Sequence, residues 1–281
     1  MLKYSVDQLI AETGKLPPMP QAALKALALI RSPDSSAANL ASVIGTDQVL
    51  TTHVLRWANS AFYGMESRIA TVQQAIVVLG LDIVQELIMN YSLSDHLNKP
   101  LPGYILPGGE LWRHALGTAI GAKLISKRFR LKIDDEAYFA GLLCDVGKLV
   151  FEKLLRETDV NRIEWGQHSF LEMERDNFGV DHAMLGAEIA RRWQLPESLV
   201  TAIAHHHEPQ MAQNHQLLAA TIHVADVSMM ILGVGIGVDG LRYPLEESAL
   251  KRLGMTWEDL FHHVEQVAEQ LTKAKELINL G

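Results

Sequence analysis

Apolar residues recur along almost the whole sequence with the spacing of an α-helix, and this feature constrains the fold most strongly. β-Branched residues form only short runs, and these runs lie inside the helical patterns, so the signal for strands is weak. The pattern predicts helices over residues 22–30, 39–44, 49–57, 72–79, 81–93, 111–129, 135–155, 169–177, 183–193, 198–205, 217–231 and 256–280. We therefore predict an all-α protein.

A stretch rich in proline and glycine separates the predicted helices into two groups. Residues 98–103 read Asn-Lys-Pro-Leu-Pro-Gly and residues 107–109 read Pro-Gly-Gly, which disfavours a continuous helix. We predict an N-terminal helical lobe over residues 1–98 and a second helical lobe over 109–232. A C-terminal helical region over 241–281 follows a glycine-rich loop. That loop lacks the preceding strand and following helix of a nucleotide-binding motif.

Composition and charge restrict the classes of function. The formal net charge of -8 opposes electrostatic binding to nucleic acid or to anionic membranes. No apolar run reaches the roughly 18 residues that span a bilayer. A single cysteine excludes an internal disulfide bond. We expect a cytoplasmic protein that binds neither nucleic acid nor membranes.

Acidic residues and histidines in the second predicted lobe lie where helices could bring them together. Glu110 and His114 are four positions apart, so a helix would present both side chains on one face. Asp145 is placed in a short turn after an apolar helix. Asp226 lies in an otherwise apolar helix, where an unpaired carboxylate would be costly. The potential ligands are Glu110, His114, Asp145, His182, His206, His207 and Asp226.

These residue types together suit a divalent metal, although each alone has a simpler interpretation. Imidazole and carboxylate favour iron, manganese or zinc, with magnesium less favoured as histidines increase. Two bridged ions would polarise a phosphoryl oxygen and lower the pKa of a bound water. However, a single histidine is most often a surface or capping residue. Asp145 could cap its own turn, and Asp226 could pair with Lys148, Arg191 or Arg192.

The order of these residues resembles the HD superfamily of metal-dependent phosphohydrolases. A histidine is followed by Gly-Leu-Leu-Cys-Asp-Val-Gly-Lys at residues 141–148, then by a histidine, by His-His-Glu and by an aspartate on a helix. The HD-GYP branch also has a glutamate four residues before the first histidine. The resemblance implies one or two metal ions and, in an active enzyme, Asp145 and Lys148 as catalytic residues. It implies as metal ligands Glu110, His114, Cys144, Asp145, His182, His206, His207 and Asp226.

Two departures from the HD-GYP pattern bear on activity. Cys144 occupies the place of a ligating histidine. A thiolate binds zinc or iron well, but the cysteine side chain is shorter, so we expect a half-occupied or single-metal site. The Gly-Tyr-Pro segment is also absent, since Pro-Gln-Met-Ala follows Glu208. Its absence argues against hydrolysis of cyclic-di-GMP.

Motifs in the first lobe are similar to those of the HDOD domain. They are Leu-Pro-Pro-Met-Pro at residues 16–20, Ser-Val-Ile-Gly-Thr-Asp at 42–47, Leu-Arg-Trp-Ala-Asn-Ser-Ala-Phe-Tyr-Gly at 55–64 and Ala-Ile-Val-Val-Leu-Gly at 75–80. With the second lobe, the resemblance covers about residues 10–230. It implies a two-lobed helical fold whose second lobe is an HD-like bundle. It also implies a role in bacterial signalling, where many members have lost catalytic ligands.

Three functions are consistent with these features. The first is a signalling and interaction module without turnover, whose metal site is vestigial or structural and whose partner is a signalling protein. The second is an active metal-dependent phosphohydrolase that acts on a nucleotide or a cyclic dinucleotide. The third is binding of a nucleotide second messenger without hydrolysis, in a cleft between the lobes. We favour the first because of Cys144 and the absent Gly-Tyr-Pro segment; the oligomeric state is left open.

Overall fold

The regular structure of this chain is helical. A computed structural model describes residues 8–10, 36–60, 62–157, 169–237 and 242–274. Within these ranges, the single extended pairing is an isolated antiparallel bridge between Leu101 and Leu106. The predicted all-α class is thus confirmed, while the predicted helix over 22–30 lies outside the described residues. No helix in the described ranges is long and apolar enough to cross a membrane.

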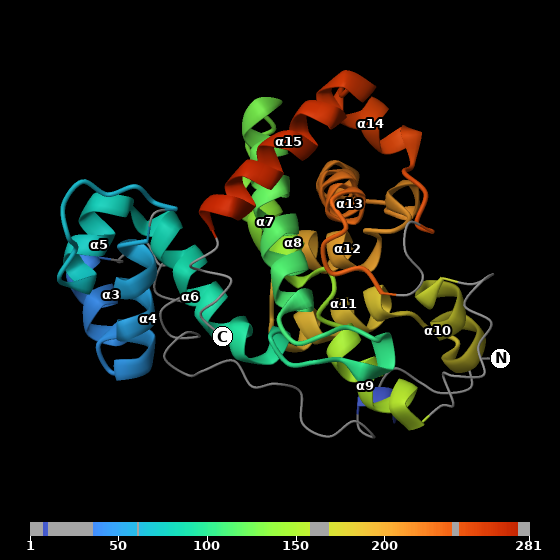
Figure 1. Cartoon of the computed structure of the whole chain (residues 1–281), viewed down its shortest axis with the longest axis horizontal. Helices are drawn as coiled ribbons and strands as arrows, with labels where there is room; N and C mark the ends of the chain where they lie inside the picture. The colour runs from blue at the N-terminus through green and yellow to red at the C-terminus, as the bar shows by residue number, and fades with distance from the viewer. Residues whose placement is uncertain (1–7, 11–35, 61, 158–168, 238–241, 275–281) are drawn as a thin grey trace. The chain divides into compact units, whose positions relative to one another are not determined.

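The chain forms two compact units. Figure 1 colours the chain by residue number, from blue at the N-terminus to red at the C-terminus. The described part of the smaller unit comprises residues 36–60, 62–96 and 270–274. The described part of the larger unit comprises residues 8–10, 97–157, 169–237 and 242–269. All the predicted ligands lie in the larger unit.

The smaller unit is built from short helices with side-chain caps. Its helices are α3 (Ala37–Ile44), α4 (Gln48–Ala58), α5 (Val72–Leu79) and α6 (Leu81–Leu97), of which the last residue of α6 falls in the other unit. The side chains of Ser36, Asp47 and Thr71 accept hydrogen bonds from the first turns of α3, α4 and α5. Gly80 ends α5 at φ 88°, a conformation that favours glycine, and α6 begins at the next residue.

The larger unit is organised around two buried helices. Its elements are η1 (Pro102–Tyr104), α7 (Glu110–Arg128), α8 (Asp134–Leu143), α9 (Lys148–Glu157), α10 (Phe170–Phe178), α11 (His182–Arg192), α12 (Glu197–Ala204), η3 (Pro209–Met211), α13 (Gln216–Ile231), α14 (Glu247–Leu253) and α15 (Trp257–Lys273). Helix α7 packs against α8 and α13, and α12 packs against α8, α11 and α13. Helices α7 and α13 are buried over most of their length, which places α13 at the centre of this unit.

The predicted helical stretch over 135–155 is interrupted at its middle. Helix α8 ends at Leu143 and α9 begins at Lys148, so Asp145 lies in the turn that was predicted to hold it. A Cβ atom at Gly147 would lie 1.9 Å from the carbonyl oxygen of His182 and 2.7 Å from the nitrogen of Gly186. The turn therefore approaches α11 backbone to backbone, and only glycine fits there. This close approach brings Asp145 next to the first residue of α11.

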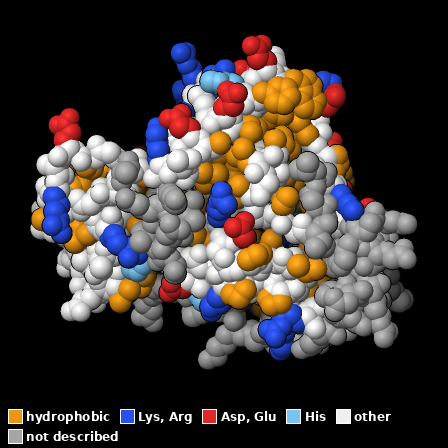
Figure 2. Space-filling model, in the orientation of Figure 1, with side chains coloured by type: hydrophobic (Ala, Val, Ile, Leu, Met, Phe, Trp, Pro, Cys, Tyr) orange, Lys and Arg blue, Asp and Glu red, His pale blue; other side chains and the backbone are white. Residues whose placement is uncertain are grey.

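The C-terminal helix begins with a side-chain cap and has two different faces. The hydroxyl of Thr256 accepts from the backbone nitrogen of Asp259, and the Asp259 carboxylate accepts from that of Thr256. Val264 and Val267 are buried, whereas Trp257 and Phe261 are 51% and 61% exposed. Figure 2 shows hydrophobic side chains at the surface over α14 and α15. Helix α15 is thus amphipathic, as its pattern predicts.

Candidate metal centre

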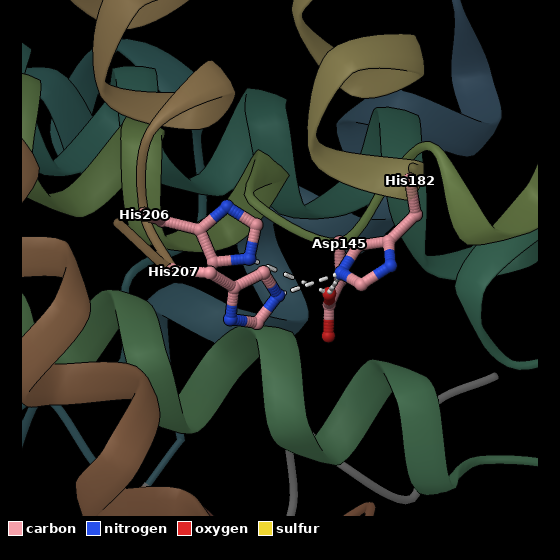
Figure 3. Close-up of side chains that lie close together, drawn as sticks. All are labelled: Asp145, His182, His206 and His207. Carbon is pink, nitrogen blue, oxygen red and sulfur yellow. Dashed lines mark hydrogen bonds and ion pairs between the residues drawn. The ribbon is translucent and has the colours of Figure 1, made fainter. Parts of the chain in front are cut away.

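Four predicted ligands converge on one point in the larger unit. Asp145 comes from the turn between α8 and α9, His182 begins α11, and His206 and His207 follow α12. One potential ligand atom from each residue lies within 4.8 Å of every other. Figure 3 shows the three imidazoles directed toward the Asp145 carboxylate. We call this group the histidine cluster.

Hydrogen bonds outside the histidine cluster orient two of its rings. His182 Nδ1 lies 2.8 Å from Glu174 Oε2, and His206 Nδ1 lies 2.7 Å from the carbonyl oxygen of Ile203. An ionised carboxylate and a carbonyl can only accept, so both Nδ1 atoms carry a proton and donate it. The Nε2 atoms of both rings are thereby directed into the cluster.

The centre of the histidine cluster contains acceptors without donors. Asp145 Oδ1 and His206 Nε2 are buried and have no hydrogen-bond partner. His182 Nε2 lies 2.9 Å from His207 Nε2 and 3.3 Å from Asp145 Oδ1. Buried acceptors that face one another are costly unless a proton or a cation lies between them. Three imidazole nitrogens and one carboxylate oxygen also form a donor set that suits a transition metal, so these residues fit a divalent ion.

The pKa shifts in the histidine cluster indicate the same need for positive charge. Burial by itself lowers the pKa of His182, but the charge of Glu174 and the close contacts with the Asp145 and Glu174 carboxylates outweigh it and raise that pKa to about 10. Burial, together with the charges of the neighbouring His206 and His182, lowers the pKa of His207 well below its usual value and leaves that ring neutral. A bound cation would supply the charge that the His182 proton otherwise provides, and would release that proton.

A second group, the carboxylate cluster, consists of His114, Asp145 and Asp226. His114 Nε2 lies 2.7 Å from Asp226 Oδ1 and 3.7 Å from Asp145 Oδ2, and its Nδ1 donates to the carbonyl of Val234. Burial lowers the pKa of His114, but the hydrogen bond and charge of Asp226 outweigh it and raise that pKa. Lys148 Nζ lies 2.8 Å from Asp145 Oδ2. Lys148 and a protonated His114 therefore already place positive charge beside the carboxylates of this cluster. Asp226 Oδ2 is nevertheless buried without a hydrogen-bond partner.

The other two predicted ligands lie outside both clusters. Glu110 is on α7 one turn before His114, as the spacing predicts, but its carboxylate accepts from the backbone nitrogen of Gly235 at 3.1 Å. Cys144 is fully buried, and its thiol donates to the carbonyl of Gly141 at 3.2 Å. Burial raises the pKa of that thiol well above its usual value. The structure thus brings together six of the predicted ligands, and ligation itself stays a prediction for all eight.

Residues outside the predicted ligand set also surround the histidine cluster. Glu174 is completely buried on α10 and contacts His182. His223 Nδ1 donates to the carbonyl of His206, and the ring of Tyr243 stacks on His207 with 5.1 Å between centroids. For Glu174 a signal was present, since it lies four residues from both Phe170 and Phe178 on the apolar face of its helix. A carboxylate there requires a buried partner.

A small cavity lies beside the two clusters. Tyr104, His114, Lys148, Phe170 and Tyr243 are among the residues that line it. Its volume is about 20 Å³, which is room for about one water molecule. In this conformation the cavity does not admit a nucleotide.

Residues 16–209, which are more than half of this chain, match the family described as the HDOD domain. A protein of Treponema pallidum (strain Nichols), described as uncharacterized, is 27% identical over 224 residues. The matched region is 77% of this chain but 42% of that protein, so this chain spans less than half the length of its relative.

Two solved structures share the fold. An HDOD domain protein of unknown function from Geobacter sulfurreducens is 26% identical with a TM-score of 0.80, and the match covers 98% of this chain and 97% of that one. A protein of Shewanella amazonensis SB2B described as a "putative phosphohydrolase" is 22% identical with a TM-score of 0.73, covering 99% and 100% of the two chains. The helical HDOD architecture predicted from the motifs is therefore confirmed.

Proposed function

Because this chain belongs to the HDOD domain family, we propose that it is a bacterial signalling module in which the histidine cluster binds one divalent metal ion. In this proposal it hydrolyses phosphoesters slowly or not at all. It acts in the cytoplasm through a signalling protein or a nucleotide second messenger, without binding nucleic acid or membranes.

One observation carries the metal part of the proposal. Asp145 Oδ1 and His206 Nε2 are buried acceptors without donors, and His182 and His207 direct further ring nitrogens at the same point. The donor set favours iron, manganese or zinc. A bound ion would supply the charge that joins the α8–α9 turn to the start of α11 and the end of α12.

The carboxylate cluster supports binding of one ion rather than two. It lacks the histidine that the HD pattern has at position 144, and the Cys144 thiol donates to Gly141 instead. His114 lies within hydrogen-bond distance of Asp226, and the Lys148 ammonium lies against Asp145. These two groups supply positive charge where a second ion would otherwise supply it.

An active metal-dependent phosphohydrolase is the second candidate. The observation that favours it is Lys148, whose ammonium lies at 2.8 Å from Asp145 and lines the small cavity. Lys148 would then bind a phosphate oxygen, and Asp145 would orient the attacking water and hold its proton. The Shewanella protein described as a phosphohydrolase is consistent with this alternative, although its 22% identity supports only the fold.

Metal analysis of the purified protein tests the first proposal. After loading with zinc, manganese or ferrous iron and removal of free ions, we expect one tightly bound ion per chain. His206→Ala should lose it, since that change removes an inward-directed nitrogen. The matched control is His205→Ala, because His205 is the adjacent histidine and lies outside both clusters. Absence of metal from the wild type, or equal loss in both variants, would overturn the proposal.

A hydrolysis assay separates the two candidates. The loaded protein is incubated with cyclic dinucleotides and with bis(p-nitrophenyl) phosphate, and the products are measured. We expect turnover no faster in the wild type than in Asp145→Ala. Rapid turnover by the wild type that Asp145→Ala or Lys148→Ala abolishes would favour the phosphohydrolase instead.

A further inference from the structure

Glu174 is a completely buried carboxylate that lies outside both ligand clusters. Its Oε2 accepts from the backbone nitrogen of His182 at 2.7 Å and from Nδ1 of the same residue at 2.8 Å. Its Oε1 accepts from the hydroxyl of Tyr104 at 2.5 Å. Three hydrogen bonds satisfy a group whose burial would otherwise be strongly unfavourable.

Capping of α11 does not by itself account for this arrangement. The N-cap of α11 is Asp181, whose carboxylate accepts from the backbone nitrogen of Met184. Arg175 in turn holds Asp181 at 2.8 Å. Unlike Asp181, Glu174 also bonds the His182 ring, at Nδ1. The interaction specific to Glu174 is therefore the one that orients the His182 ring.

Glu174 also distinguishes His182 from the neighbouring His206. His206 Nδ1 donates to a neutral carbonyl, that of Ile203, whereas His182 Nδ1 donates to a carboxylate. A carboxylate partner makes the other ring nitrogen more basic, and therefore a stronger metal ligand, and it holds the ring in one orientation. His182 Nε2 is the nitrogen directed at Asp145 and His207.

We propose that Glu174 and Tyr104 are positioning residues for the metal ion. Glu174 holds His182 with Nε2 directed into the histidine cluster, and the Tyr104 hydroxyl holds the Glu174 carboxylate in the orientation that does so. Tyr104 comes from η1 and Glu174 from α10. Two elements that supply no ligand therefore set the orientation of the ligand His182. This inference rests on the proposed metal binding.

Metal affinity tests the inference through Glu174→Gln, which keeps the size of the side chain and removes its charge. Competition with a chelating dye for Zn²⁺ or Co²⁺ should show affinity weaker by about 10- to 100-fold, the usual effect of losing such a partner. Tyr104→Phe should weaken binding in the same direction but less. Glu172→Gln is the matched control, because Glu172 lies on the same helix and its carboxylate accepts from Ser169 in the capping box. Equal affinities for Glu174→Gln and Glu172→Gln would overturn the inference.

Nuclear magnetic resonance of the metal-free protein gives a readout independent of metal binding. With ¹⁵N-labelled histidine, and His182 assigned by comparison with His182→Gln, the wild type should show a protonated Nδ1. Glu174→Gln should shift this signal and allow exchange between ring orientations. If the wild type binds no metal but shows this shift, the proposed function fails while the positioning of His182 stands. An unchanged His182 signal in Glu174→Gln would overturn the positioning role, whatever the metal affinity.

Discussion

The side chain of Cys144 lies outside both ligand clusters, although its neighbour Asp145 belongs to both of them. Adjacent residues in a turn direct their side chains differently, so the aspartate of this pair reaches the centre and the cysteine sulfur bonds to Gly141. Burial raises the pKa of the thiol, which keeps it protonated and makes it a poor metal ligand as it stands. The identity of residue 144 therefore affects how many metal ions we expect the site to bind.

Cys144→His should restore a ligand to the carboxylate cluster, because imidazole is longer than a thiol and binds metal in its neutral form. We expect a second bound ion and at least about a tenfold rise in hydrolysis of bis(p-nitrophenyl) phosphate, which is about 1.4 kcal/mol of transition-state stabilisation. Metal content and initial rates are measured together. Cys144→Ser is the control and should gain neither. A second ion without any rise in rate would show that Cys144 is not what limits hydrolysis.

At the scale of elements, the turn between α8 and α9 and the start of α11 form one rigid junction. Gly147 allows the two backbones to touch. Gly186 of α11 lies at the same contact, where a Cβ atom on Gly186 would lie 3.4 Å from the backbone nitrogen of Gly147. The junction holds Asp145 and His182 together before any ion binds. The sequence predicts the helices on both sides but not their close contact, because the two segments are far apart in the chain.

Gly147→Ala should disrupt this junction, because its Cβ would lie 1.9 Å from the His182 carbonyl and backbone cannot move aside cheaply. We expect a loss of about 3 kcal/mol or more in the free energy of unfolding. Gly121→Ala on α7 is the control, since its nearest neighbours at 3.3 Å are side-chain atoms of His263 and Val267. Urea unfolding measures both variants. Equal stability of the two would contradict the close contact inferred for Gly147.

At the scale of the whole molecule, the larger unit extends beyond the part that matches the HDOD family. The family match ends at residue 209, whereas α13, α14 and most of α15 belong to the same compact unit as the clusters. His263 of α15 is buried near Gly121 of α7, and its Nε2 has no hydrogen-bond partner. Burial, with the charges of Arg128 and His262, lowers the pKa of His263 to about 4.

The stability of this unit should therefore fall at acidic pH. Between the ordinary pKa of 6.5 and about 4, the unfolded chain binds a proton at His263 that the folded chain does not, so the stability present above pH 6.5 is lost as the pH falls. The shift corresponds to roughly 3 kcal/mol at most. Urea unfolding at pH 7 and 4.5 should show a smaller loss for His263→Leu than for wild type. His262→Gln removes only the smallest of the causes that lower the His263 pKa, so its loss should be close to that of the wild type. A loss in His263→Leu identical to that of the wild type would exclude this role for His263.

The sequence by itself determined what depends on neighbours within a few turns of helix. Helical periodicity predicts the all-α class, and the spacing of Glu110 and His114 places them on one face of α7. The helix predicted from residue 256 corresponds to α15, which begins at Trp257. Ordered motifs predicted the family, since they lie in a characteristic succession along the chain.

Only the tertiary structure decided which ligands meet. Asp145, His182 and His206 converge because three elements pack together, and that packing depends on side chains distant in the sequence. The same packing leaves Glu110 bonded to Gly235 and buries Glu174 against His182. A pattern along the chain indicates which residue types are present, but the direction of a side chain depends on the local turn and on the partners that long-range contacts bring to it.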